Sequence, residues 1–111
     1  MLEAAMLCWL DDTPGLDGLE RWPAFRERVS GAIARVMAGP PGRRVAVFTS
    51  GGPIGFSVHL SLKAPARSFL DVNWRIRNCS LTEFLFDRER FALEGFNSIA
   101  HLDDPPLRTF R

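Results

Sequence analysis

Apolar residues run without interruption through Val45–Phe48, and two glycines follow Ser50 a few positions later. An unbroken apolar run is typical of a strand covered on both faces, as in the parallel sheet of an α/β protein. The glycines permit a sharp turn, and the proline after them suits the first turn of a helix. The pattern predicts a buried parallel strand over Val45–Thr49 and a helix over about Pro53–Leu62.

Apolar residues at steps of three and four predict a second helix over Trp22–Ala38, which Gly39-Pro40-Pro41-Gly42 should end. Residues 2–10 have the spacing of the end of a helix, and a short helical piece should include Phe69 and Leu70. Glu20, just before the long helix, is an acid/base candidate, although a carboxylate placed to stabilise a helix start is the simpler interpretation.

Toward the C-terminus the pattern changes to that of a hairpin. A strand over Cys79–Phe86, a polar turn over residues 87–90 and a return strand over Phe91–Phe96 are predicted, with Cys79 as a small buried residue. We expect one α/β domain over residues 1–102 and a flexible tail over residues 103–111.

Composition sets further limits. A chain of 111 residues forms at most one domain, and its net charge of +1 gives no reason to expect nucleic acid or a charged membrane surface as a partner. No stretch is long enough to span a membrane, and two cysteines make no disulfide framework. No ligands are spaced for a metal, no cofactor is implied, and the short apolar N-terminus is not a convincing signal peptide, so cytoplasmic localisation is expected.

The candidate chemistry lies at the turn after the predicted strand. A strand-turn-helix joint directs backbone N–H groups toward the space above the strand, which suits a phosphate group. Ser50 and Gly51 are therefore the candidate phosphate-binding residues. A serine hydrolase using Ser50 is a weaker interpretation, because no histidine or acid is spaced as a recognisable partner.

Three motifs, in this order and spacing, resemble the histidine phosphatase superfamily, the phosphoglycerate mutase-like proteins. The resemblance runs from about Glu20 to Leu102. The motifs are Thr49-Ser50-Gly51-Gly52, Asn78-Cys79-Ser80 and Asn97-Ser98-Ile99-Ala100-His101-Leu102. It implies a three-layer α/β/α fold and phosphoryl transfer or phosphate-ester hydrolysis, with phosphate or a phosphorylated small molecule as the partner of a full-length parent. His101 then belongs to a closing motif with a structural role.

Two departures from the family pattern bear on activity. Ser50 stands where the family has its second catalytic histidine, and the Arg-His-Gly motif that supplies the phosphorylated histidine is absent from the 111 residues. In the family, the strand with that motif lies between the counterparts of Val45–Thr49 and Cys79–Phe86. The resemblance therefore implies an incomplete fold with no catalytic residues, and a Met1 that is an internal start.

The first hypothesis is an inactive C-terminal fragment of a histidine phosphatase-like protein. The second is a non-catalytic module that binds anions at Ser50 and Gly51, or that interacts with other chains. Self-association through open strand edges is expected in either case, because a missing central strand leaves backbone groups unpaired.

Overall fold

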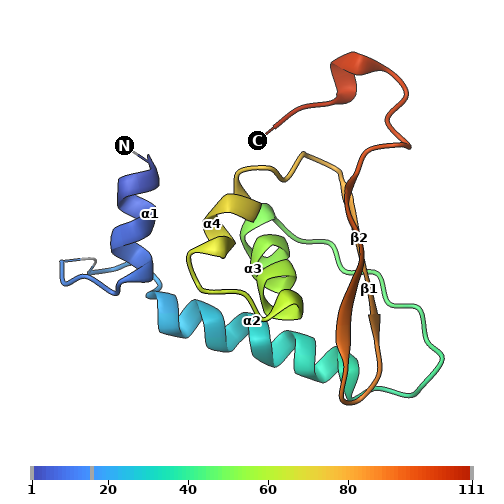
Figure 1. Ribbon diagram of the computed structural model, residues 1–111, viewed down its shortest axis with the longest axis horizontal. Helices are drawn as coiled ribbons and strands as arrows, with labels where there is room; N and C mark the ends of the chain where they lie inside the picture. The colour runs from blue at the N-terminus through green and yellow to red at the C-terminus, as the bar shows by residue number, and fades with distance from the viewer. Residues whose placement is uncertain (1, 16, 111) are drawn as a thin grey trace.

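The computed structural model describes residues 2–15 and 17–110. Helices α1 (Leu2–Leu10), α2 (Trp22–Met37), α3 (Gly51–Leu62) and α4 (Ser68–Asn73) come first. Strands β1 (Leu81–Phe86) and β2 (Phe91–Ser98) follow, and a 3-10 turn, η1 (Pro105–Leu107), lies near the C-terminus. In Figure 1, α2 runs along the base, α3 and α4 stand over it, and the β-hairpin lies to one side. Helices combined with a small antiparallel sheet confirm the expected α/β class.

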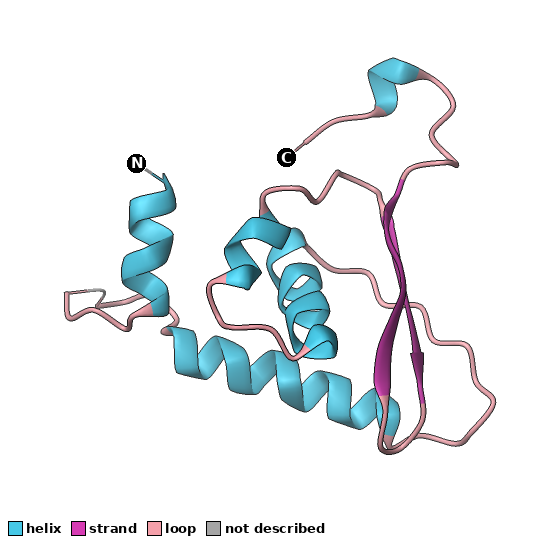
Figure 2. Cartoon of the chain, viewed as in Figure 1, coloured by secondary structure: helices cyan, strands magenta, loops and turns pink. Residues whose placement is uncertain are grey.

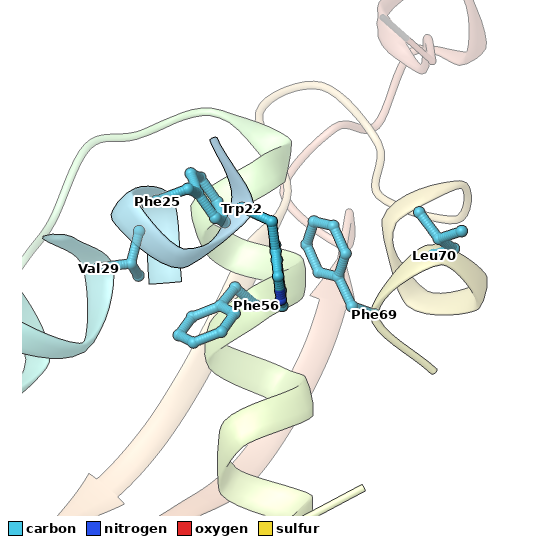
Figure 3. Close-up of a cluster of buried hydrophobic side chains, with 6 residues drawn as sticks. All are labelled: Trp22, Phe25, Val29, Phe56, Phe69 and Leu70. Atoms are coloured by element: carbon cyan, nitrogen blue, oxygen red, sulfur yellow. The ribbon is translucent and has the colours of Figure 1, made fainter. Parts of the chain in front are cut away.

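The core is an aromatic cluster between α2, α3 and α4. The rings that touch in this cluster have centroids 5.5–6.1 Å apart, and they belong to Trp22, Phe25, Phe56 and Phe69. Figure 3 shows these four side chains converging from three helices. Phe56 and Phe69 are each only 1% exposed. The stripe predicted on α2 is the side that faces this cluster, so the apolar spacing identified the buried face correctly.

Helix α1 adds a further aromatic side chain to the cluster. The Trp9 ring meets Trp22 edge-on at a centroid distance of 5.3 Å and Phe25 at 5.1 Å. Its indole N–H donates to the Glu20 carbonyl at 2.7 Å, which ties α1 to the start of α2. An apolar ring with a satisfied polar edge suits a position at the margin of a core.

The hairpin is confirmed, with small changes at its ends. β1 and β2 pair antiparallel, with Phe84 opposite Leu93 and Phe86 opposite Phe91, and the Phe84 and Phe91 rings stack at 4.3 Å. Asp87 Oδ1 accepts hydrogen bonds from the backbone N–H groups of Glu89 and Arg90, which fixes the turn. The expectation for Cys79 was wrong. It is exposed and has a φ of 56°, a left-handed conformation that keeps it out of the strand.

The predicted strand over Val45–Thr49 was also wrong in this structure. Residues 43–50 form an open connection between α2 and α3, and among the described residues this connection joins no sheet (Figure 2). Its apolar side chains are exposed, Val47 to 67% and Phe48 to 97%. The physical reason is the lack of a ladder partner, because β1 and β2 pair with each other and no other described strand is present.

The C-terminal residues lie against the loop that precedes the hairpin. Thr109 accepts hydrogen bonds from Asn78 through its backbone carbonyl and its hydroxyl, both at 2.9 Å. The Arg77 guanidinium lies over the Phe110 ring, 5.1 Å from its centroid. The domain boundary at residue 102 and the flexibility of residues 103–111 stay predictions.

Candidate functional site

Ser50 is the N-cap residue of α3. Its φ of −97° and ψ of 174° are extended, and its carbonyl accepts the first helical hydrogen bond, from Ile54 N–H at 3.4 Å. Its side chain makes no capping hydrogen bond and the residue is exposed. The Ser50 hydroxyl is therefore accessible to a ligand at the start of the helix.

The next three residues determine which backbone donors this helix offers. The first amides of a helix have no intrahelical acceptor, and Pro53 has no N–H, so the donors are those of Gly51 and Gly52. Gly51 already interacts within the chain and lies beside Asn73 and Ile76. Gly52 lies against the Phe25 ring, and its N–H has no hydrogen-bond acceptor among residues 2–15 and 17–110. Ser50 and Gly52 are therefore the groups that the fold leaves open, and Gly52 is a residue that the sequence motif contained but our prediction left out.

Neither histidine of the chain is adjacent in sequence to Ser50, which stands where the family has its second catalytic histidine. His59 lies nine residues along from Ser50, about 13 Å at the rise of an α-helix. Burial lowers the pKa of His59, and an interaction with the backbone of Pro65 opposes this shift in part. The Nδ1 atom of His59 is buried without a well-formed hydrogen bond to a described residue. The His101 Nε2 lies 2.8 Å from the Cys79 carbonyl oxygen, which fits the structural role expected for it.

Glu20 is engaged in an ion pair. Its two carboxylate oxygens accept hydrogen bonds from the Arg28 guanidinium, both at 2.9 Å. The hydrogen bond from Arg28 lowers the pKa of Glu20, while partial desolvation opposes the shift. A general acid needs the opposite shift, so the helix-start interpretation fits this geometry better than an acid/base role.

One cleft of the structure lies away from Ser50. It has a volume of about 410 Å³ and lies between the Gly39–Arg43 loop and the hairpin turn at residues 86–89. Ser50 and Gly51 do not line it. Ser50 itself is exposed at the helix end, whereas a reacting phosphoryl group is usually held where water is excluded.

The closing motif has a clear structural role in this geometry. Asn97 adopts a left-handed φ of 59°, and its side chain accepts from Arg77 N–H at 2.8 Å and donates to the Arg75 carbonyl at 2.6 Å. Its own N–H donates to Thr82 Oγ1 at 3.1 Å. Asn97 and His101 together fasten the segment before β1 to the end of β2.

Among residues 2–15 and 17–110, no three His, Cys, Asp or Glu side chains are grouped to hold a metal ion. In the same residues, no helix has both the length and the apolarity needed to cross a membrane.

The chain is thus an α/β chain whose candidate phosphate site is formed by Ser50 and the glycine pair that follows it at the start of α3. The family model of the histidine phosphatase superfamily (branch 1) matches residues 2–99, and the chain therefore belongs to that superfamily. The match extends beyond the three motifs at the N-terminal side and includes α1. No match to this chain was found among the curated proteins or among the solved structures.

Proposed function

We propose that this chain binds a phosphate group or a phosphate monoester at the start of α3 and does not transfer it. The observation behind the proposal is the Ser50 hydroxyl, free of any capping bond, next to an unpartnered Gly52 amide at a helix N-terminus. The chain belongs to the histidine phosphatase superfamily, and for this reason we propose phosphate as the anion. Serine donates a hydrogen bond but adds no positive charge, so we expect weak binding.

We expect no catalysis by this chain alone, for a chemical reason. Phosphoryl transfer in the superfamily needs a histidine nucleophile in line with the leaving oxygen, together with cations around the equatorial oxygens. The chain has two histidines, His59 within α3 and His101 at the Cys79 carbonyl, and neither follows an arginine. We propose that phosphate-ester chemistry requires residues that these 111 do not supply, as the fragment hypothesis states.

The binding test is a titration with inorganic phosphate followed by the backbone amide signals in NMR. We expect saturable shifts at Gly51 and Gly52 that Ser50→Asp abolishes, because a carboxylate at the N-cap occupies the helix end and repels the anion. Ser61→Ala is the matched control on the same helix, since the Ser61 hydroxyl is already bonded to the Val58 carbonyl. Shifts that are absent, or that persist in Ser50→Asp, would contradict the binding proposal.

The activity test uses wild type and Ser50→His with a generic aryl phosphate. We expect no turnover from either protein and no acid-labile phosphohistidine by mass spectrometry, because restoring one histidine supplies no nucleophile. A phosphohistidine mapped to His59 or His101 would overturn the proposal. Labelling by a fluorophosphonate probe that is lost in Ser50→Ala would instead favour serine hydrolase chemistry.

A further inference from the structure

The cleft between the end of α2 and the hairpin turn is lined by two segments that lie far apart in the sequence. One is Met37 with the loop over residues 39–43, and the other is the turn between β1 and β2 at residues 86–89. Figure 1 shows this turn beside the C-terminal end of α2. The volume of about 410 Å³ falls within the usual size of small-molecule sites, roughly 300–1,000 Å³.

Both walls of the cleft are held by local constraints. On one wall, the rings of Pro40 and Pro41 fix two consecutive φ angles. On the other wall, Asp87 Oδ1 accepts hydrogen bonds from the backbone N–H groups of Glu89 and Arg90, at 2.7 and 2.6 Å. The cleft is therefore formed without a ligand, which reduces the cost of binding one.

Gly39 makes room for the first cation of the cleft, Arg43. Its φ is not positive, so the backbone conformation does not require glycine at this position. A Cβ atom at residue 39 would instead overlap Nη2 of the Arg43 guanidinium. The missing side chain of Gly39 thus leaves the space in which the Arg43 guanidinium packs.

Arg88 supplies the second cation from the opposite wall. It borders this cleft and also a smaller neighbouring one of about 230 Å³. Neither Arg43 nor Arg88 has an ion-pair partner among residues 2–15 and 17–110. Guanidinium groups with no carboxylate partner in the protein are suited to bind an oxyanion of a ligand.

The rest of the lining restricts the charge and shape of that ligand. The carboxylates of Asp87 and Glu89 also border the cleft, so a ligand with one negative charge is repelled less than a phosphate dianion. The other side chains of the lining are apolar: Met37, Pro40, Pro41 and Phe86. Such a surface favours a flat ring over a polar body.

We propose that this cleft binds an aromatic monocarboxylate, with its carboxylate at Arg43 and Arg88 and its ring against the apolar part of the lining. Ser50 does not line the cleft, so this site is separate from the phosphate site at the start of α3. The two sites therefore bind different anions and are tested independently.

The probe for the test is 2-naphthoate, titrated into the protein and followed by the backbone amide signals in NMR. We expect saturable shifts at Gly42, Arg43 and residues 86–89. Arg88→Gln should raise the Kd about fivefold, because it removes one of the two cations. Arg90→Gln is the matched control, since it removes the same charge from the same turn but from a residue that does not line the cleft. Shifts that are absent or lie elsewhere, or Arg88→Gln that binds as wild type does, would overturn the proposal.

A second variant tests the placement of Arg43 without changing any charge. Gly39→Ala displaces the guanidinium and should raise the Kd for 2-naphthoate about threefold. Gly31→Ala on α2 is its control, because a Cβ there meets no atom within 4 Å. Equal affinity in Gly39→Ala and wild type would refute the role of Arg43.

Two analogues with the same ring test the charge of the ligand. We expect 2-naphthylmethylamine, a cation, to cause no shifts at the cleft, and 2-naphthyl phosphate to bind there more weakly than 2-naphthoate. An amine that binds as well as the carboxylate would show that the arginines do not select the ligand. A phosphate ester that binds the cleft more tightly would overturn the choice of a monocarboxylate.

Discussion

At the scale of single residues, His59 is the side chain whose protonation is most clearly coupled to folding. It lies on α3, its ring centroid is 5.6 Å from that of Phe56, and burial lowers its pKa below the ordinary value of 6.5. The unfolded chain then binds more protons than the folded chain as the pH falls through this range. The neutral imidazole therefore contributes stability above about pH 6.5 that is lost as the pH falls toward the folded-state pKa.

We accordingly expect His59→Gln to flatten the dependence of Tm on pH between pH 7.5 and 5. Thermal melts followed by circular dichroism at several pH values measure the slope. Leu60→Gln is the control, because it introduces the same side chain one position away without removing a titratable group. An equal slope in His59→Gln and wild type would show that another group is responsible.

A second residue-scale prediction concerns Asn97. Asn97→Ala loses two side-chain hydrogen bonds, each of about 0.5–1.5 kcal/mol. It also places alanine in a left-handed conformation, at a cost of about 1–2 kcal/mol. We expect the free energy of unfolding in urea to fall by about 2–5 kcal/mol from these magnitudes. Ser98→Ala, at the exposed neighbouring position, should change it little, and a similar loss in both variants would contradict this role.

At the scale of elements, the aromatic cluster packs α2, α3 and α4 against one another. Phe56 supplies the central ring of α3 and is 1% exposed. We expect Phe56→Ala to lower the free energy of unfolding by about 3–5 kcal/mol, because it leaves a cavity among rings that cannot close over it. Leu62→Ala on the same helix, where Leu62 is 58% exposed, should cost less than about 0.5 kcal/mol. Equal losses in the two variants would mean that the cluster is not the core.

The elements also show what the sequence could predict. Helices α2 and α3 were predictable because their apolar spacing repeats and glycine or proline lies near their ends. The hairpin was predictable because two apolar stretches flank the polar turn at residues 87–90. The strand over Val45–Thr49 was not, since an apolar run specifies a strand only where another strand supplies the ladder. For the candidate site, the motif located Ser50 at the helix start. The contacts of Gly51 and the open Gly52 amide depend on how α3 packs against Phe25 and Asn73, which no local pattern records.

At the scale of the whole molecule, burial is uneven. The fully buried rings all lie among the helices, whereas Leu81 and Leu85 of β1 are 53% and 62% exposed. Local stability follows buried apolar contacts, so the hairpin should open more often than the helical part. We expect hydrogen exchange to be faster for the amides paired between β1 and β2 than for the central amides of α2 and α3. Equal protection in both parts would show that the chain unfolds only as one unit.

The exposed connection also has a consequence for proteolysis. Proteases bind their substrates in extended form, and Arg43 and Arg44 offer trypsin two adjacent cleavage points on an unpaired backbone. A single nick there divides the chain into one piece with α1 and α2 and another with α3, α4 and the hairpin. Trp22 and Phe25 of the first piece remain packed against Phe56 and Phe69 of the second. Brief digestion should therefore give two peptides on a denaturing gel that still elute together in native gel filtration, a two-piece protein held together by its mainly aromatic core.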